Sequence, residues 1–402
     1  MKFLFINSNC GSGSSGRITT EQYAMVKKHG HQAKIAFAHG KPHNVDPSDT
    51  FLIHHKVDYY IHNALSRITD RAGFYSHFVT RRLIAFIDDY RPDIIHLHNL
   101  HGYYVNIEVL FDYLSSLDIP VVWTLHDCWA FTGHCVHYSF EGCFKWKKEC
   151  HHCPLKKTYP QSLFMDQSRR NFMEKKRLFT SIKNLYITTP SRWLASQVEE
   201  SFLGDYPIIP IYNGIDLEVF KYHESDIRTR LGIPNNKTLL LGVAYVWSRS
   251  KGLSDFLKLD TQLDHSKYQI LLVGLDDNQL AQLPISIIGM QRTKSVEELV
   301  EIYSTADVFI NPSYEETMGM VTAEALACGT PAIVYNATAV PEVVDESSGI
   351  VVDAGDIDAL CSSIPAALML KSSLVKERPK AFERSKQYEK YYCLYTKVLG
   401  YE

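Results

Sequence analysis

The chain has 402 residues, which is enough for two domains of ordinary size, each with its own core. Its hydrophobic content of 45% and charged content of 22% are typical of a globular protein. The formal charge of −3 provides no global positive field to attract nucleic acid, so a nucleic-acid-binding protein is not expected. No segment is expected to have the length of a membrane span.

The N-terminal segment combines an apolar run with a glycine-rich loop. Residues 2–7 are too short for a secretory signal and predict a buried first strand, so we expect a cytoplasmic protein with reduced thiols. The loop that follows has the Gly-x-Gly-x-x-Gly spacing, with Gly13 as its second glycine, and could let backbone approach a phosphate. The second predicted strand, residues 33–38, ends at His39 without the acidic residue that binds a ribose. We therefore favour a flexible loop over a dinucleotide site.

Apolar runs that predict buried strands alternate with amphipathic segments along the whole chain. This alternation predicts an α/β protein with two parallel sheets, each covered by helices. A proline-containing segment, residues 204–214, predicts the joint, giving domains 1–206 and 207–380 and a helical segment 381–402 beyond the second sheet. Strands are predicted at residues 2–7, 33–38, 93–98, 121–126 and 184–189, and at 238–246, 269–274, 285–290, 307–312 and 331–336.

Histidines gather where two predicted strands end, and ligands of parallel sheets bind at these carboxyl ends. His126 ends the strand 121–126, and a structural role for it is the alternative. The strand 93–98 ends in a polar segment. No carboxylate near its histidines completes a metal site, so a role in lining a cleft toward an acceptor is preferred. The acceptor-side candidates are His98, Asn99, His101 and Tyr103.

The segment 311–331 predicts a strand end, a loop with Glu316 and an alanine-rich helix that ends at Gly329. The start of such a helix offers free N–H groups and a positive dipole end, which suit phosphate or sugar oxygens. Glu324 lies among alanines on this helix, and a carboxylate buried there without a partner would be costly. The two hydroxyls of a ribose would satisfy it; the alternative is contact with solvent or an arginine.

Cysteines are concentrated in one turn-rich segment. Cys135, Cys143, Cys150 and Cys153 have spacings of seven, six and two intervening residues. Four thiolates suit a tetrahedral structural zinc site that would hold together a long loop, and nearby histidines are competing ligands. Free thiols, a disulfide and an iron–sulfur site are the alternatives.

Glu316 and Glu324, separated by seven residues within YEETMGMVTAEALACGTPAIVYNATAVPEVV, resemble the E-x7-E signature of glycosyltransferase family 4. These are retaining enzymes of the GT-B fold, in which two Rossmann-like domains face each other across a cleft. The resemblance covers almost the whole chain. DIIHLHNLHGYYVN and WTLHDCWAFTGHC are most similar to bacterial enzymes that build colanic acid, capsule and O-antigen.

The resemblance implies a role for individual residues. Glu324 would bind the donor ribose and Glu316 the transferred sugar, and Lys251 would bind the diphosphate. His126 would lie at the donor sugar and, with Glu316 and Lys251, would form the catalytic set. The C-terminal helical segment 381–402 would pack back onto the N-terminal, acceptor-side domain. Further donor-binding residues would be Gly13, Arg249, Met290, Met318, Gly319 and Met320.

One position departs from the family pattern. Many relatives have an arginine six residues before the lysine, as a second diphosphate ligand, but Tyr245 stands there. Arg249 or Arg292 could replace that arginine, and the sequence does not choose between them. The assignment of Lys251 is unaffected.

The resemblance implies transfer of a sugar from a UDP- or GDP-sugar to an acceptor hydroxyl, with no cofactor required for catalysis. The acceptor would be a glycan or lipid-linked glycan in bacterial surface polysaccharide biosynthesis, which suggests peripheral contact with the inner face of the membrane. Trp146 and its neighbouring lysines are a candidate docking patch, with a solvated loop as the alternative. The alternative functions are an NAD(P)-dependent oxidoreductase and an inactive nucleotide-sugar-binding protein.

Overall fold

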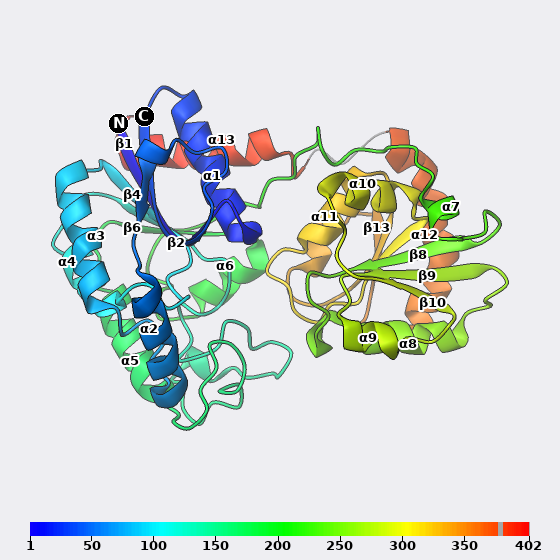
Figure 1. The fold of residues 1–402 in the computed structure, drawn as a ribbon, viewed down its shortest axis with the longest axis horizontal. Coiled ribbons are helices and arrows are strands. Elements are labelled where there is room, and N and C mark those ends of the chain that lie inside the picture. Colours follow the sequence, from blue (N-terminus) through cyan, green and yellow to red (C-terminus); the bar gives the residue numbers. More distant parts are fainter. Residues whose placement is uncertain (377–380, 402) are drawn as a thin grey trace. The chain divides into compact units, whose positions relative to one another are not determined.

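The computed structural model describes residues 1–376 and 381–401. The chain divides into two compact units (Figure 1). Unit 1 contains Met1–Tyr212 and the C-terminal residues from Gln387, and unit 2 contains Asn213–Lys386. The boundary predicted after residue 206 falls a few residues before the observed one. The boundary predicted at residue 380 lies outside the described residues.

Unit 1 is built on a seven-stranded parallel sheet with the order β3-β2-β1-β4-β5-β6-β7. Phe3 and Phe5 of β1 face one side of this sheet, and Leu4 and Ile6 face the other, which is why the first strand is apolar throughout. Two three-residue strands were not predicted, and one of them, β7, lies within the segment assigned to the joint. The strands are β1 (Lys2–Cys10), β2 (Gln32–Gly40), β3 (Thr50–Leu52), β4 (Ile94–Leu97), β5 (Val121–Thr124), β6 (Leu185–Thr189) and β7 (Ile208–Pro210).

Helices cover both faces of the first sheet. Side chains of α1 and α13 pack with Phe3 and Phe5, whereas side chains of α3 to α6 pack with Leu4 and Ile6. The helices are α1 (Gly13–Lys28), α2 (Lys56–Thr69), α3 (His77–Tyr90), α4 (Ile107–Leu114), α5 (Ser168–Phe179), α6 (Arg192–Glu199) and α13 (Arg384–Val398), with short 3-10 turns η1 (Pro47–Asp49) and η2 (Lys145–Lys147).

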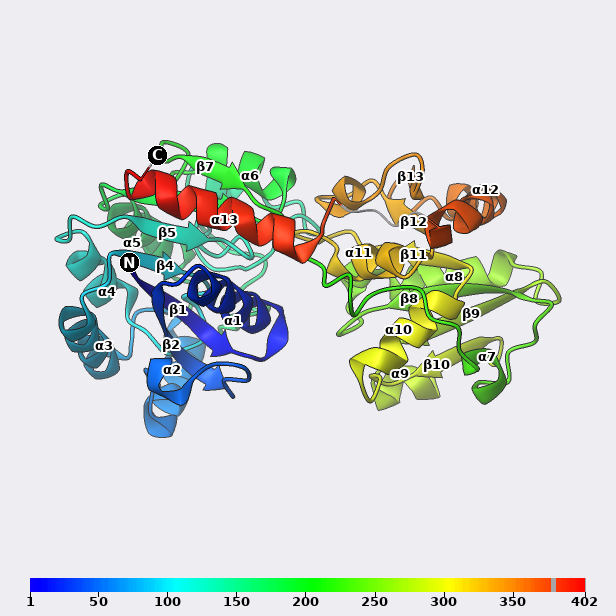
Figure 2. The same cartoon turned by 90° about the horizontal axis from the view of Figure 1, so that it is seen from above.

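The C-terminal helix α13 supplies part of the core of unit 1 (Figure 2). Tyr391 and Tyr395 are fully buried against this face of the sheet. Both ring nitrogens of His96 in β4 form hydrogen bonds beneath α13. Nδ1 lies 2.6 Å from the hydroxyl of Tyr395, and Nε2 lies 2.7 Å from Thr124 Oγ1. His96 is therefore a structural residue that connects the sheet to α13.

Unit 2 is built on a six-stranded parallel sheet with the order β10-β9-β8-β11-β12-β13, so the α/β class with two parallel sheets is confirmed. Its strands are β8 (Thr238–Val243), β9 (Tyr268–Val273), β10 (Ile287–Met290), β11 (Val308–Asn311), β12 (Ala332–Tyr335) and the unpredicted β13 (Gly349–Val352). Its helices are α7 (Ile227–Arg230), α8 (Leu253–Gln262), α9 (Asp277–Ala281), α10 (Val296–Thr305), α11 (Met320–Ala327) and α12 (Ile357–Lys376), with 3-10 turns η3 (Arg249–Lys251) and η4 (Val340–Val343).

Among the described residues, one helix is long and apolar enough to cross a membrane by length and composition alone, contrary to expectation. It comprises Ile357–Val375, within α12. Leu360, Ile364 and Ala367 of this helix are buried with Phe256 of α8 and with residues of the second sheet. Part of its apolar surface is therefore explained by packing within unit 2.

Candidate functional site

The sheet of unit 2 has its topological switch point between β8 and β11, where ligands of such sheets bind. The loops that follow these two strands are tied together, because Tyr314 N donates to the carbonyl of Ser250 over 2.8 Å. Gly252 makes this approach possible: its φ is +74°, and a Cβ there would lie 2.3 Å from the carbonyl oxygen of Pro312. The fold thus places Lys251 beside the loop that carries Glu316.

Lys251 and Glu316 form an ion pair, in which Nζ lies 2.5 Å from Glu316 Oε1. The same ammonium donates to the carbonyl of Glu315 over 3.1 Å, and Glu316 N donates to Thr338 Oγ1 over 2.9 Å. The two side chains are 28% and 19% exposed, so both groups are held in place and still reachable by a ligand. The structure therefore brings together two residues that the sequence analysis assigned to one site.

The start of α11 lies in the loop that follows Glu316. Gly319, with φ +84°, precedes the helix in a left-handed conformation. Within the described part of the chain, the backbone amides of Met318, Gly319 and Met320 donate to no protein acceptor. Met318 itself is buried, and its sulfur accepts a hydrogen bond from Asn213 N. The free amides can bind phosphate or sugar oxygens.

Glu324 lies on α11 and is only 6% exposed. The hydroxyl of Tyr303 donates to its Oε2 over 3.1 Å. Burial, together with this carboxylate, holds the pKa of Tyr303 well above its usual value, so the tyrosine stays a donor. Glu324 therefore does not merely reach solvent, and contact with an arginine remains the alternative.

Tyr245, which stands where many relatives have an arginine, contacts another arginine of this chain. The guanidinium of Arg292 lies 3.7 Å over the Tyr245 ring, and Arg292 Nη2 is 3.4 Å from the carbonyl oxygen of Tyr245. Both residues line a pocket of about 350 Å³ at the ends of β8, β9 and β10. Met290 closes β10, and its carbonyl accepts from the amides of Gly274 and Leu275.

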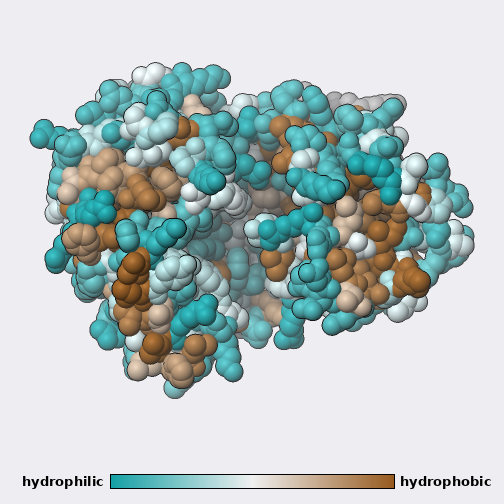
Figure 3. Space-filling model, in the orientation of Figure 1, coloured by the Kyte–Doolittle hydropathy of each residue, from teal (hydrophilic) through white to brown (hydrophobic). Residues whose placement is uncertain are grey.

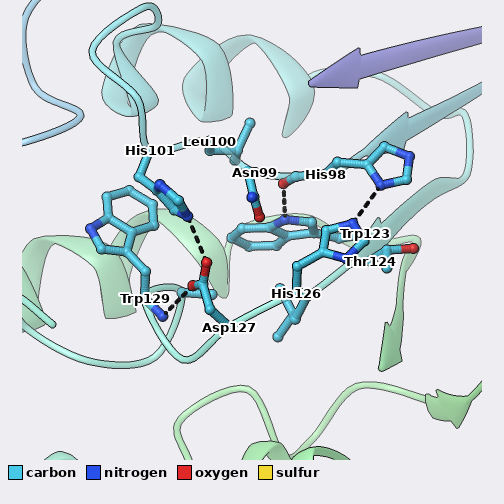
Figure 4. Close-up of a pocket in the computed structure, with 11 residues that line it drawn as sticks. His98, Asn99, Leu100, His101, Trp123, Thr124, His126, Asp127 and Trp129 are labelled. Carbon is cyan, nitrogen blue, oxygen red and sulfur yellow. Dashed lines mark hydrogen bonds and ion pairs between the residues drawn. The ribbon is translucent and has the colours of Figure 1, made fainter. Parts of the chain in front are cut away.

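Unit 1 has a polar pocket at the ends of β4 and β5 (Figure 4). His98 Nδ1 lies 3.0 Å from His126 Nε2, and the two rings are stacked. His101 Nε2 lies 2.7 Å from Asp127 Oδ2, and Asp127 Oδ1 accepts from Trp129 N over 2.9 Å. We refer to His98, His101, His126 and Asp127 as the unit 1 cluster.

The sequence analysis missed two partners in this region. Asp127 follows His126 directly, but its pairing with His101 had no signal in the sequence. The Tyr159 hydroxyl lies 3.1 Å from His101 Nδ1, from a loop far along the chain. Burial tends to raise the pKa of Asp127, but the charge and hydrogen bond of His101 outweigh it and lower that pKa to about 2. Asp127 is therefore a carboxylate at neutral pH.

Three further candidate residues belong to unit 1 but not to the unit 1 cluster. Asn99 lines the pocket, and its carbonyl accepts from the hydroxyl of Tyr104. Tyr103 does not line the pocket and is buried, with its ring packed edge-on against Tyr159. Gly13 is the first residue of α1, with φ +65° and open space where a Cβ would lie. Gly13 thus belongs to unit 1, whereas the other donor-binding candidates belong to unit 2.

Lowering the pH from 7 to 5 is expected to destabilise unit 1. Burial lowers the pKa of His126 to about 4 and that of His62 to about 3. Both residues are neutral in the folded protein at pH 5, whereas their unfolded pKa is about 6.5. The unfolded state therefore binds more protons between about pH 6.5 and 4, and stability falls as the pH decreases through this range.

Thermal unfolding of the wild type and His62→Gln at pH 7, 6 and 5 measures this effect. The glutamine replaces the buried titrating ring, which lies 2.7 Å from the Ser76 hydroxyl. The variant should show a weaker loss of stability between pH 7 and 5 than the wild type. Parallel pH profiles for the two proteins would contradict the contribution of His62.

The four predicted zinc-binding cysteines line one pocket of unit 1 with His134 and Trp146. Among the described residues, however, no group of three or more His, Cys, Asp or Glu side chains is arranged to hold a metal ion. All nine cysteines are free, so the disulfide alternative has no support in the structure. The zinc site remains a prediction.

Trp146 is not part of an exposed membrane patch, contrary to expectation. It is 1% exposed and packs against Phe131 and Tyr138 within the main core cluster of unit 1. Lys145 Nζ donates to the carbonyls of His151 and His152 over 3.0 Å each. The tryptophan is therefore not available to a membrane.

Comparison with known proteins follows the same division of the chain. Residues 16–219 match the family described as Glycosyltransferase Family 4, and residues 236–369 match Glycosyl transferases group 1. The glycosyl transferase WcaC of Escherichia coli, named for colanic acid biosynthesis, is 26% identical over 274 residues, which are 64% of this chain and 63% of WcaC. The match therefore covers less than two thirds of that relative. The O-antigen chain mannosyltransferase B of E. coli is 31% identical over 106 residues, 26% of this chain and 28% of the relative.

Solved structures match this chain over its full length. The match to sucrose-phosphate synthase from Thermosynechococcus elongatus has a TM-score of 0.71 at 16% identity and covers 100% of each chain. Anabaena HepE, solved in complex with UDP and glucose, has a TM-score of 0.67 at 15% identity, with 99% of this chain and 100% of HepE covered. At such identities the likeness shows the GT-B fold alone. Because one family match takes in more than half of the residues, and the fold agrees, the chain belongs to glycosyltransferase family 4.

Proposed function

We propose that this protein is a retaining glycosyltransferase that moves a sugar from a nucleotide-diphosphate-sugar to an acceptor hydroxyl. The observation that carries the proposal is the Lys251–Glu316 ion pair beside the free amides of the α11 start. A cation, a carboxylate and unpaired N–H groups within one loop system suit a ligand that has both a diphosphate and sugar hydroxyls. Glu324 adds a buried carboxylate for the ribose.

In this proposal the protein acts by positioning and electrostatics. Negative charge develops on the departing diphosphate, and Lys251 and the α11 amides stabilise it. Glu316 orients the sugar, and the acceptor attacks from the face that the nucleotide leaves. Because these groups supply the charge stabilisation, we propose transfer without a metal ion in the catalytic step.

Unit 1 would contribute the acceptor side. The low pKa of His126, caused by burial, means that its ring is neutral, so it would form hydrogen bonds to the donor sugar without adding a positive charge. The carboxylate of Asp127, held by His101, offers an acceptor for a sugar hydroxyl. A neutral imidazole beside a fixed carboxylate is suited to binding polyhydroxylated molecules.

Arg292 is our candidate for the second diphosphate cation in place of the missing arginine. The Tyr245 ring supports the guanidinium from below and keeps it at the wall of the pocket formed by the ends of β8 to β10. Stacking leaves the N–H edge of a guanidinium available for phosphate oxygens. Tyr245 would then position Arg292, and Arg292 would take over the role of the arginine that many relatives have at position 245.

The donor is proposed to be a UDP- or GDP-sugar, with UDP preferred because HepE was solved with UDP and with UDP-glucose. Nucleotide release should be measured across UDP-, GDP- and ADP-sugars with a glycan acceptor mixture. Thermal shift with UDP, GDP and NAD provides a second readout. Stabilisation by NAD alone would contradict the transferase and favour an oxidoreductase, and binding of a nucleotide without any turnover would favour an inactive binding protein.

We further propose that the acceptor is a lipid-linked glycan of bacterial surface polysaccharide biosynthesis. The support is the similarity to WcaC and to an O-antigen mannosyltransferase. Such an acceptor requires the cytoplasmic protein to work at the inner face of the membrane.

We propose α2 as the membrane-contacting surface, and its exposed apolar side chains support this proposal (Figure 3). Val57, Tyr60, Ile61, Leu65 and Ile68 follow helical spacing along one face of α2 and are all exposed. The exposed residues Leu163, Phe164 and Met165 continue this surface, since Leu163 N donates to the carbonyl of Arg67. Lys56 and Arg67 are exposed at the two ends of α2 and would meet anionic headgroups. We call these residues the α2 surface.

Flotation with vesicles containing phosphatidylglycerol tests the α2 surface. The wild type is expected to float, and the double variant Ile61→Glu/Phe164→Glu to float at least about tenfold less, because two inserted apolar side chains are replaced by charges. Met369→Glu is the matched control, since Met369 is an exposed apolar residue of unit 2. Equal flotation of the double variant and the wild type would exclude this surface.

A further inference from the structure

The loop between β5 and α5 is long and contains only one 3-10 turn, η2, as regular structure. Its fully buried aromatic side chains, including Phe131, Tyr138 and Trp146, belong to the main core of unit 1. Loops of this length without secondary structure are uncommon in compact domains and are usually functional or disordered. The same loop places Asp127 and Tyr159 at His101 of the unit 1 cluster, so its order matters for the site.

Four thiols lie together inside this loop. Cys135, Cys143, Cys150 and Cys153 line one pocket that encloses about 10 Å³, which is room for about one water-sized sphere. Gly133 N donates to Cys150 Sγ over 3.2 Å. A pocket of atomic size with four sulfur atoms in its wall has the composition of a tetrahedral structural site.

Two buried polar groups lie beside the pocket. Lys175 is 1% exposed, and its Nζ donates to the carbonyls of Trp129 and Thr132, over 2.8 and 3.1 Å, and lies 3.4 Å from the centroid of the Trp129 ring. No ion pair in the described ranges includes it. His134 lines the pocket, and its Nε2 is buried without a hydrogen-bond partner, while Nδ1 is paired with Asp70. Buried cations and buried N–H groups require an anion or an acceptor nearby.

We propose that Cys135, Cys143, Cys150 and Cys153 bind one structural zinc ion. The four thiols would release four protons to solvent, and four thiolates around Zn²⁺ carry a net charge of about −2. Such a centre supplies the anion that Lys175 lacks and a sulfur acceptor for a histidine N–H. Since no three side chains in the described residues are already arranged as ligands, binding would require the cysteine side chains to rotate toward the ion.

Metal analysis of the full chain, purified without chelator and freed of any histidine tag, tests the proposal. Elemental mass spectrometry should find about one zinc ion per chain. Cys153→Ser should lose it, whereas the control Cys393→Ser should keep it, because Cys393 is an exposed cysteine of α13. Iron with acid-labile sulfide, or loss of zinc from both variants alike, would overturn the zinc assignment.

Because Cys153→Ser could fail to fold, a second measurement uses the wild type. A mercurial reagent that titrates thiols should release the zinc, as detected with a chromogenic chelator. After the zinc and then the reagent have been removed, the unfolding midpoint of the protein should be several degrees lower. Addition of zinc should restore the original midpoint. Reconstitution with Co²⁺ should give thiolate-to-metal charge transfer and the ligand-field bands of a tetrahedral site. A metal-free wild type whose four thiols react without any change in midpoint would refute the proposal.

Discussion

Replacing Glu316 by alanine is expected to lower kcat by about 10²–10³-fold, the usual cost of removing one preorganised electrostatic contact to a transition state. Glu316 is held by Lys251 Nζ and by its own amide to Thr338, so its carboxylate has a fixed position in the loop before α11. The ion pair is partly exposed and contributes little to stability. The unfolding midpoint should therefore change by no more than about 4 °C.

Glu315→Ala is the matched control for this experiment. Lys251 contacts the carbonyl of Glu315 and not its carboxylate, so the variant retains that contact. Steady-state nucleotide release with each variant, at saturating donor, measures kcat directly. Wild-type turnover by Glu316→Ala would remove this residue from the site, and equal losses in both variants would indicate a general disturbance of the loop.

Replacing Glu324 by glutamine is expected to raise the donor KM by about 10–100-fold, with a smaller effect on kcat. The amide keeps the shape of the side chain and an oxygen acceptor for the Tyr303 hydroxyl, but it loses the charge that strengthens hydrogen bonds to ribose hydroxyls. A contact that binds the donor equally in the ground state and the transition state affects KM and leaves kcat nearly unchanged when it is lost. Calorimetry with the free nucleoside diphosphate should show the same loss of affinity.

Tyr303→Phe separates direct binding from support of the carboxylate. It removes the hydroxyl that holds Glu324 Oε2 and leaves the carboxylate itself. We expect a KM increase smaller than that of Glu324→Gln. An unchanged KM in Glu324→Gln would disprove the ribose assignment, whatever the tyrosine variant shows.

The central strands were predictable because strands buried on both faces are nearly continuous apolar runs, as in β1 and β8. The strands that were missed lie at sheet edges. β3 and β7 have three residues each, and β7 ends in Pro210, a residue that also marks joints. β13 contains the exposed residue Val351. An edge strand has one neighbour and less burial, so its sequence is less apolar.

The candidate site was predictable where its residues are close in sequence. Glu316, Gly319 and Glu324 lie in one segment with a recognisable spacing, whereas the ion pair between Lys251 and Glu316 depends on two loops brought together by β8 and β11. The contact of His101 with Tyr159 likewise depends on a loop with no regular pattern. Trp146 beside lysines resembled an interfacial anchor, and only the tertiary packing of Phe131 and Tyr138 buries it.

The position of α13 after unit 2 in the chain has a consequence for biosynthesis. Tyr391 and Tyr395 fill the face of the first sheet formed by Phe3, Ile94 and Val122, yet they are synthesised only after the whole of unit 2. Until then this face stays open to water, and His96 Nδ1 lacks the tyrosine hydroxyl. All of unit 2 has been synthesised by that time. Unit 1 starts before unit 2 in the chain but closes its core after unit 2 has been made, and a nascent chain stalled near residue 386 presents an apolar sheet face to chaperones.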